Sequence, residues 1–526
     1  MSDQAEVLAF LCDPASYEGR PATVERIDTH SASVFLAGEF AFKLKRAVRY
    51  TFLDFSTEER RRHFCEAEVR LNRRTAPGLY VGVTPVTREA DGRLAFGGRG
   101  VPVDWLVVMR RFPQEQLLDR LALSGGISPE IARRLADRIA DFHAVAAPAP
   151  HRGGRAGMRD VVEDNSRALT AAGDVLDPTV VHAVNTACEE SVARLGAVLE
   201  TRRAGGFVRQ CHGDLHLRNI VLVDQVPTLF DAVEFNDDFA CIDVWYDVAF
   251  LLMDMWGRAL ASQANVVFNQ YLLRTSDLGG LPLLPLFLAC RAAIRSKTSL
   301  ASASLETDPG RRHEFEARAR DYLALAARLV VPAAPRMVAI GGLSGSGKST
   351  LAAYLAPLMG NPPGAVVLRS DVLRKALFHV APEERLGPEG YQPEVTREVY
   401  HALAGRAADV LDAGGSVVVD ATFLDPEWRD GAARVAAMAG VPFTGIWLDA
   451  PPAMMAERLS RRTGDASDAT VEVLHQQLQR QTDGILWNRI DATAPISQLA
   501  ARALAVVHDP AVVADTPDSR QCPPHP

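Results

Sequence analysis

Nine residues, 342 to 350, have the types and the spacing of a phosphate-binding loop. They read Gly-Leu-Ser-Gly-Ser-Gly-Lys-Ser-Thr and fit the pattern G-x-x-x-x-G-K-[ST] in full. An apolar run, 337–340, comes before them and predicts a buried strand, and a helix-forming run, 351–359, comes after. Between a strand and a helix N-terminus, the backbone N–H groups of such a loop can close around phosphate oxygens.

The polar residues of this loop predict contacts with ATP and Mg²⁺. We expect the Lys348 ammonium to reach the terminal phosphates and the Ser349 hydroxyl to bind Mg²⁺. The glycines let the backbone approach the phosphates closely. Besides these two, the loop residues expected around the nucleotide are Gly342, Ser344, Gly345, Ser346, Gly347 and Thr350.

A second group of polar residues stands well before this loop. His212 and Asp214 form a His-x-Asp sequence, and Asn219 follows the Asp by five residues. Asp231 comes after an apolar run, 221–223, and a turn. The His-x-Asp sequence with this Asn is the catalytic-loop arrangement of protein-kinase-like phosphotransferases. The spacing therefore predicts a second site for phosphoryl transfer.

Length and composition limit what surrounds these two groups. The chain has 526 residues, 48% apolar and 23% charged, which predicts about three domain-sized units of ordinary globular type. The net charge of −8 gives no support to a general nucleic-acid or membrane binder. Seven cysteines without metal-site spacing indicate free thiols in a reducing compartment.

No targeting or membrane segment is indicated. The N-terminus lacks the basic and apolar runs of a signal peptide. The most apolar stretch, 244–256, is short and contains Asp247 and Asp254, so it predicts a core helix rather than a membrane span. We therefore expect a cytoplasmic protein.

The first half of the chain changes from a strand pattern to a helix pattern. Strands are expected at 24–27, 33–36, 40–45 and 105–109, with one helix at about 57–74. Because side chains alternate along a strand, Ala41 and Lys43 share a face. Later helices are expected at about 129–145, 160–173, 178–202, 242–258, 262–274 and 283–303.

On these motifs, residues 24 to about 325 resemble the aminoglycoside-phosphotransferase branch of the protein-kinase-like fold. The resemblance implies that Asp214 orients and deprotonates the acceptor hydroxyl. It implies that Asn219 and Asp231 hold Mg²⁺ on the triphosphate. His212 and Asp247 are implied as supports of the catalytic loop.

The same resemblance implies that Lys43 contacts the ATP phosphates and pairs with Glu68. Lys45 is a rival for Lys43, and Glu66 is a rival for Glu68. The glycine-rich loop of protein kinases is absent, and the polar stretch Thr29–Ser33 stands in its place. The antibiotic kinases also lack the full glycine pattern, so this absence does not argue strongly against ATP binding. A domain that keeps this fold but has lost turnover is an open alternative.

The Pro/Ala stretch at 330–335 predicts a domain boundary. Beyond it, strands are expected at 337–340, 365–368, 416–420 and 443–448, and helices at 351–359, 394–413, 426–438, 452–462 and 468–481. Alternating strands and helices predict a parallel sheet covered on both faces. The Pro-rich end, 509–526, predicts a disordered tail.

This second half resembles the small P-loop kinases, an AAA-type group that holds gluconate kinase, the polynucleotide 5′-kinases and zeta toxins. The resemblance implies that Asp371 activates the acceptor hydroxyl and that Arg374 binds an anionic part of the acceptor. Asp420, at a strand end, is implied as the Mg²⁺-linked carboxylate. Arg458 and Arg462, four residues apart on one helical face, are implied as lid residues over ATP. A helix cap at Asp371 and a solvated arginine face are the alternatives.

We therefore expect a fusion of two kinase domains. A bilobal α+β kinase-like domain is expected over 1–331, with a small lobe at about 24–110 and a large lobe at about 114–328. A linker, 332–336, leads to an α/β P-loop kinase domain over 337–508.

The expected activity is phosphate transfer from ATP, with Mg²⁺, to hydroxyls of unidentified small molecules at two sites. Two alternatives stay open: an ATP-binding regulatory protein with one pseudo-kinase domain, and a kinase acting on nucleic-acid 5′ ends. The net charge of −8 argues against the second alternative. Each half is expected to fold and to bind ATP on its own.

Overall fold

The computed structural model describes residues 4–50, 53–382, 384–461, 466–482 and 484–508. Its internal contacts divide the chain into two compact units. The first unit comprises Met1–Gln263, Leu273–Thr275 and Leu286–Val330, and the second comprises Ala264–Leu272, Ser276–Pro285 and Val331–Pro526. The tail predicted at 509–526 lies outside the described residues.

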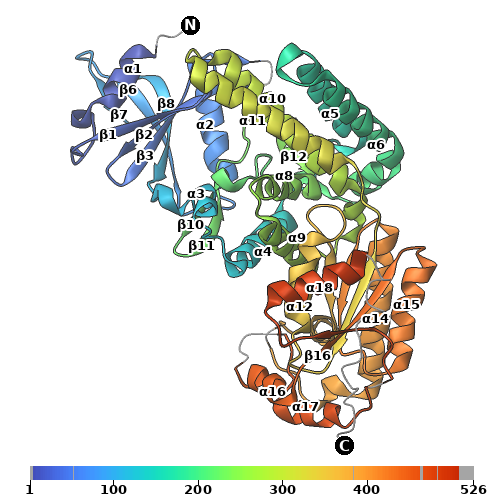
Figure 1. Cartoon of the computed structure of the whole chain (residues 1–526). Helices are drawn as coiled ribbons and strands as arrows, with labels where there is room; N and C mark the ends of the chain where they lie inside the picture. Colours follow the sequence, from blue (N-terminus) through green and yellow to red (C-terminus); the bar gives the residue numbers. More distant parts are fainter. Residues whose placement is uncertain (1–3, 51–52, 383, 462–465, 483, 509–526) are drawn as a thin grey trace, which may run out of the picture. The chain divides into compact units, whose positions relative to one another are not determined.

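A six-stranded antiparallel sheet forms the small lobe of the first unit, in the order β1-β2-β3-β8-β6-β7 (Figure 1). Its strands are β1 (Val24–Asp28), β2 (Ala32–Ala37), β3 (Phe40–Lys45), β6 (Tyr80–Arg88), β7 (Leu94–Phe96) and β8 (Val101–Arg110); a short pair, β4 (Arg49–Tyr50) and β5 (Leu53–Asp54), follows β3. Consecutive side chains of β8 face opposite sides. Leu106 packs with Val7 of α1 (Ala5–Cys12), and Val107 packs with Cys65 of α2 (Glu58–Asn72). One helix therefore covers each face of the sheet.

Helices make up most of the large lobe of the first unit. They are α3 (Leu118–Leu123), α4 (Pro129–Val145), α5 (Gly154–Thr170), α6 (Pro178–Ala204), α7 (Asp237–Ala240), α8 (Val244–Gly257), α10 (Leu284–Leu305) and α11 (Pro309–Val330). Two short antiparallel pairs frame the predicted catalytic loop: β9 (Val208–Gln210) with β12 (Cys241–Asp243), and β10 (Ile220–Val223) with β11 (Val226–Leu229). Helix α8 is buried along most of its length, so it gives this loop a rigid base.

A five-stranded parallel sheet forms the centre of the second unit, in the order β14-β15-β13-β16-β17. Its strands are β13 (Met337–Gly342), β14 (Val366–Arg369), β15 (Val417–Asp420), β16 (Phe443–Asp449) and β17 (Asn488–Asp491). In chain order, the helices after β13 are α12 (Lys348–Leu355), α13 (Ser370–Leu377), α14 (Pro393–Asp412), α15 (Pro426–Met438), α16 (Pro452–Ser460), α17 (Val471–Leu478) and α18 (Ile496–His508). The predicted parallel sheet is confirmed.

Helices cover both faces of this parallel sheet. Val338 of β13 packs with Leu351 of α12 and Ala500 of α18 in one apolar core. Helices α14 and α15 lie on the opposite face (Figure 1). The phosphate-binding loop therefore joins a buried central strand to a helix that is packed along its length.

Most expected elements are present with shifted ends, and some were not expected. The helix expected at 160–173 begins earlier, at Gly154, and the helix expected at 351–359 begins at Lys348. Helices α11 and α18 and strand β17 were not indicated by the sequence pattern. Helix α11 begins in a run of charged residues, and β17 is a short strand at the edge of its sheet.

The edge strand of the second unit is covered by helix α9 (Ala261–Thr275), which precedes the predicted boundary. Asn269 Oδ1 accepts a hydrogen bond from Val367 N (2.7 Å), and its Nδ2 donates to Ala365 O (3.2 Å). Asn265 Nδ2 donates to Pro363 O (3.0 Å) and Ala365 O (3.1 Å). Two amide side chains thus satisfy backbone groups that an uncovered edge strand would expose.

We expect the Asn269→Ala substitution to loosen β14. The Val367 amide would lose its acceptor, and an unpaired buried backbone group costs about 1–3 kcal/mol. Hydrogen exchange of the Val367 amide should therefore become faster in the full chain. Ser262→Ala, on the exposed face of the same helix, is the control and should leave this amide protected. Equal protection in both variants would show that α9 does not hold the edge strand.

One helical stretch among the described residues, Leu278–Leu305, is long and apolar enough to cross a membrane by length and composition. Its apolar window has a mean hydropathy of 1.4, and 67% of that window is buried inside the protein. Burial of this kind is also found in the core helices of soluble proteins.

Candidate phosphotransfer sites

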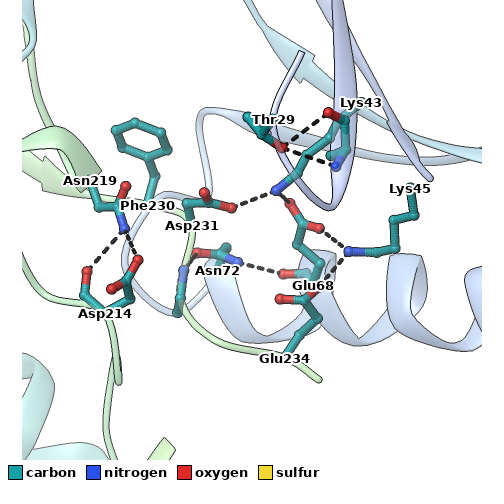
Figure 2. Close-up of polar contacts among 12 residues, drawn as sticks. Thr29, Lys43, Lys45, Glu68, Asn72, Asp214, Asn219, Phe230, Asp231 and Glu234 are labelled. Atoms are coloured by element: carbon teal, nitrogen blue, oxygen red, sulfur yellow. Dashed lines mark hydrogen bonds and ion pairs between the residues drawn. The ribbon is translucent and has the colours of Figure 1, made fainter. Parts of the chain in front are cut away.

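The Lys43 ammonium lies between two carboxylates in the first unit (Figure 2). Its Nζ is 2.8 Å from Glu68 Oε1 and 2.6 Å from Asp231 Oδ1. Burial by itself lowers the pKa of Lys43, but the Asp231 and Glu68 carboxylates outweigh burial and raise that pKa well above its usual value. The lysine–glutamate pair implied by the resemblance is therefore present, and Lys43 is a cation at neutral pH.

The two rivals of this pair have different surroundings. Glu66 is half exposed and pairs with Arg62, four residues earlier on α2 (2.9 Å). Glu68 is fully buried. Lys45 is a second partner of the same carboxylate, with its Nζ 2.6 Å from Glu68 Oε2.

Asp214 presents its carboxylate beside Asn219 and His216. Asn219 Nδ2 donates to Asp214 Oδ2 and to the Asp214 backbone oxygen, both at 2.9 Å. His216 Nε2 lies 3.3 Å from Asp214 Oδ2. Burial by itself raises the pKa of Asp214, but His216 outweighs it, and the pKa falls below its usual value. An ionised, partly exposed carboxylate of this kind can orient an acceptor hydroxyl.

The loop that carries Asp214 is fixed from beneath by helix α8. Asp247 Oδ2 accepts from His212 N (3.0 Å), and Asp247 Oδ1 accepts from Gly213 N (2.9 Å). His143 Nε2, from α4, lies 3.1 Å from the same carboxylate. Gly213 has φ +82, and a Cβ there would lie 2.7 Å from Phe239 O, so the loop needs glycine. The implied support of the loop by Asp247 is confirmed.

Asn219 and Asp231 offer oxygen donors that suit Mg²⁺. Asn219 donates through its Nδ2, so its amide oxygen is left as an acceptor. The Asp231 side chain is 41% exposed, although one oxygen pairs with Lys43. Mg²⁺ prefers oxygen ligands of this type. The donor set fits the ion, while the roles of both residues remain predictions.

The phosphate-binding loop of the second unit needs its glycines for steric reasons. Gly345 has φ +82, and a Cβ there would lie 2.6 Å from Met455 O. A Cβ on Gly342 would lie 2.7 Å from Ser346 Oγ. The Ser346 hydroxyl is fully buried and has no hydrogen-bond partner among the described residues. A buried hydroxyl of this kind could donate a hydrogen bond to an anion bound in the loop.

Two cationic side chains donate hydrogen bonds to backbone oxygens of this loop. Lys348 Nζ donates to Leu343 O (3.0 Å), across the loop. Arg458 Nη1, from α16, donates to Ser346 O (3.2 Å) and to Gly345 O (3.4 Å). The other residues predicted in this loop, Ser344, Gly347, Ser349 and Thr350, follow in the same strand–loop–helix turn. Arg462, predicted as a lid residue, lies outside the described residues.

Asp420 ends strand β15 beside the loop. Its Oδ2 accepts from Ser349 Oγ (2.6 Å) and lies 3.4 Å from Arg369 Nε. Asp371 is in the first turn of α13, directly after β14, whose last residue, Arg369, is in register with Asp420. Burial, together with the Asp420 carboxylate, raises the pKa of Asp371 above its usual value. A serine hydroxyl bonded to a strand-end carboxylate is the donor set expected for Mg²⁺ in a P-loop site.

Arg374 contacts the protein rather than open space. Its Nη1 donates to Gly390 O (2.7 Å) and lies 3.4 Å from Thr396 Oγ1. Its guanidinium carbon lies 5.0 Å from the centre of the Tyr391 ring. The Nε atom is buried without a partner among the described residues. The predicted binding of an acceptor anion therefore depends on this remaining face of the side chain.

Several residues near these sites were not singled out by the sequence. Arg369 lies beside Asp420, and its place at the carboxyl end of a strand was the available signal. His216 belongs to no recognised motif, but its Nε2 lies 3.3 Å from Asp214 Oδ2. Lys45, predicted as a rival of Lys43, pairs with Glu68 and with Glu234, a residue that no motif singles out.

Two family models match the chain. Residues 40–284 match the phosphotransferase enzyme family, and residues 337–483 match the AAA domain family. The chain therefore has a kinase-like phosphotransferase domain followed by a P-loop kinase domain, and it is an ATP-dependent phosphotransferase.

Relatives and solved structures are similar to one or both parts of the chain. The Mycobacterium tuberculosis protein Rv2004c is 30% identical over 484 residues, which cover 90% of this chain and 94% of the relative. Ribose 1,5-bisphosphate phosphokinase PhnN of a Chelativorans species is 28% identical over 191 residues, 34% of this chain and 88% of that protein. A choline/ethanolamine kinase family protein from Mesorhizobium loti is 14% identical, with a TM-score of 0.36, and the match covers 62% of this chain and 99% of that one.

Proposed function

We propose, since the chain belongs to the same family as the M. tuberculosis protein Rv2004c, that both of its units bind ATP with Mg²⁺ and transfer phosphate to hydroxyls of small molecules. One observation carries this proposal. Each unit has a carboxylate suited to a base, a lysine suited to phosphate, and a pair of oxygen ligands, and in the second unit Asp371 interacts electrostatically with Asp420 and Lys348. Phosphoryl transfer needs little beyond such positioning and charge neutralisation. The six described cysteines are free, in keeping with a cytoplasmic protein.

In the first unit, Asp214 would orient the acceptor hydroxyl and take its proton as the new bond to phosphorus forms. Lys43, held by Glu68, would bind the α- and β-phosphates of ATP. Asn219 and Asp231 would hold Mg²⁺, which neutralises phosphate charge when bound. The lowered pKa of Asp214 keeps its carboxylate ionised throughout the neutral range.

In the second unit, the loop backbone and Lys348 would surround the β- and γ-phosphates. Ser349 and Asp420 would hold Mg²⁺ through the hydrogen-bonded arrangement at the end of β15. Asp371 would orient the acceptor hydroxyl from the carboxyl edge of the sheet, where open α/β folds bind ligands. Arg458 bonds the loop carbonyls and would keep the loop in shape as the nucleotide enters.

Calorimetric titration of the full chain with Mg²⁺ and a non-hydrolysable ATP analogue tests the two-site proposal. Two nucleotides per chain are expected. A library of small hydroxyl compounds, with ATP consumption as the readout, then identifies the acceptors. One nucleotide per chain, together with turnover from only one unit, would favour the regulatory alternative in which the other unit is a pseudo-kinase.

The acceptor of the second unit is proposed to carry a negative group as well as a hydroxyl. Ribose 1,5-bisphosphate phosphokinase, a relative of this part of the chain, acts by its name on a phosphorylated sugar. Arg374 supplies a buried guanidinium three residues after Asp371 on α13, and an arginine fork suits phosphate or carboxylate. A phosphorylated or carboxylated hydroxyl compound is therefore the first choice for the screen.

Substitutions at Asp371 and Arg374 should separate the two roles in this unit. Asp371→Asn should lower kcat by about 10²–10⁴-fold, the usual contribution of a general base. Arg374→Ala should chiefly raise KM for the acceptor. Arg397→Ala, on the exposed side of α14, is the control and should change neither constant. If Arg374→Ala lowers the melting temperature but leaves KM unchanged, Arg374 only ties α13 to Gly390.

A further inference from the structure

Lys45, two residues after Lys43 on β3, is a buried lysine with two carboxylate partners (Figure 2). Its Nζ is 2.6 Å from Glu68 Oε2 and forms an ion pair with Glu234 Oε1. The Lys45 side chain is 1% exposed, and that of Glu234 is 7% exposed. A lysine enclosed to this degree cannot reach a nucleotide. Its contacts must therefore act on other protein groups.

One of those groups is Glu68, whose two oxygens are divided between two lysines. Lys43 takes Oε1 and Lys45 takes Oε2. Burial by itself raises the pKa of Glu68, but the two lysines outweigh burial and lower it to about 2. If Lys43 turns toward the phosphates of ATP, Lys45 still supplies a counter-charge to the buried Glu68. Glu68 then stays ionised and can continue to hold Lys43.

The other group is the segment from Asp231 to Glu234. Asp231 has φ +62, a left-handed backbone that few residues with a Cβ adopt. Such a conformation persists only where the surroundings hold it in place. Asp231 N donates to Tyr80 OH (3.1 Å), and Ala232 N donates to Asn72 Oδ1 (2.8 Å).

Residues of both lobes of the first unit make the remaining contacts with the segment from Asp231 to Glu234. Val233 N donates to His212 O (2.9 Å) in the catalytic loop. Glu234 is joined to β3 by its ion pair with Lys45. The Lys45–Glu234 ion pair therefore adds a charged contact to the backbone hydrogen bonds that hold the segment from Asp231 to Glu234.

We propose that Lys45 and Glu234 are positioning residues for the Mg²⁺·ATP site of the first unit. The pair fastens the segment from Asp231 to Glu234 against β3 and so places the Asp231 carboxylate. It also leaves Lys43 able to exchange Asp231 for phosphate without leaving Glu68 unpaired. This inference rests on the proposed function of the first unit.

The test uses the full chain with Lys348→Ala, which weakens the second site, so that the tighter nucleotide binding reports on the first unit. Glu234→Gln in this parent should weaken Mg²⁺·ATP binding by about 10–100-fold, the usual effect of losing a residue that orients a metal ligand. Binding of ATP without Mg²⁺ should change much less, because Lys43 and Glu68 remain. Titration with a fluorescent ATP analogue, with and without Mg²⁺, gives both constants.

The double variant Lys45→Met/Glu234→Gln separates positioning from charge balance. It removes both charges of the Lys45–Glu234 pair, and Glu68 keeps Lys43 as its partner before ATP binds, so stability should largely recover. A pair that only balanced charge would regain Mg²⁺·ATP affinity in this variant. A positioning pair would not, and we expect the affinity to stay about as low as in Glu234→Gln. Full recovery of affinity would overturn the proposal.

Hydrogen exchange gives a readout that does not depend on ATP. In Glu234→Gln, the amides of Asp231 and Ala232 should exchange faster, while those of α8 stay protected. Asp104→Asn is the matched control, because it breaks the buried ion pair between Asp104 of β8 and Arg61 (2.7 Å), which is on the same helix as Glu68. It should lower stability but leave both amides and Mg²⁺·ATP affinity unchanged.

The outcomes distinguish this inference from the proposed function. If the parent binds no ATP, the proposed function of the first unit fails, and faster exchange at Asp231 still supports the positioning role. If the parent binds Mg²⁺·ATP and Glu234→Gln alters neither affinity nor exchange, the positioning role is refuted and the proposed function stands.

Discussion

Asp214→Asn is expected to abolish phosphate transfer by the first unit and to leave its ATP binding nearly unchanged. The substitution keeps the shape of the side chain and removes its negative charge and its capacity to take a proton. Loss of a general base usually lowers kcat by about 10²–10⁴-fold. The nucleotide would be held by Lys43, Asn219 and Asp231, which this change does not remove.

Two further variants make this result specific. Asp231→Asn should weaken Mg²⁺·ATP binding itself, because it removes a proposed metal ligand and a partner of Lys43. Asp224→Asn is the matched control, since Asp224 is exposed in the turn between β10 and β11 and its left-handed backbone suits asparagine. Acceptor-dependent turnover and nucleotide affinity should be measured for all three in the full chain. Normal turnover in Asp214→Asn would show that the first unit does not use this carboxylate.

The fold was predictable where local patterns agree with burial. Strand β13 and the loop after it show both the apolar run and the glycine spacing, and the parallel sheet follows from alternating strands and helices. Helix α11 was missed because its first half is dominated by charged residues, and its first buried residue is Ala319. Strand β17 was missed because only Ile490 among its residues is buried.

Site residues were predictable where a local sequence pattern identifies them. The choice between Glu66 and Glu68 could have been made from the helix period. Arg61, Cys65, Glu68 and Asn72 recur every three or four residues and are all buried, whereas Glu66 is on the opposite side. The partner of Lys45 could not be found in this way. Glu234 lies 189 residues further along the chain, and only the folded small and large lobes bring the two together.

The domain boundary also depends on contacts between residues that are distant in the sequence. The Pro/Ala stretch is a local signal of a linker, and the parallel sheet begins directly after it. Asn265 and Asn269, however, belong by their contacts to the second unit, although they precede the stretch. Hydrogen bonds from an earlier helix to an edge strand leave no mark in local composition. Separate folding of residues 337–508 therefore stays a prediction, to be tested beside a fragment that includes α9.

Lys348→Ala is expected to remove ATP turnover by the second unit. The Lys348 ammonium donates to Leu343 O across the loop, so it lies next to the space that the loop backbone encloses. When phosphate enters, this charge would neutralise the oxygens that gain negative charge in the transition state. Loss of one such preorganised group usually costs about 10²–10³-fold in kcat. We expect a loss at the upper end, because lysine carries a full charge, together with weaker ATP binding.

This effect must be measured without phosphate transfer by the first unit. The chain carrying both Asp214→Asn and Lys348→Ala should show no turnover with any acceptor, and each single variant should keep the activity of the other unit. Lys297→Ala is the control for loss of a lysine, since Lys297 pairs with Asp164 (2.5 Å) and is far from both motifs in the sequence. If Lys348→Ala alone leaves the second unit's turnover intact, the loop does not bind the transferred phosphate. Arg458 and Arg369 would then be the cations to test in its place.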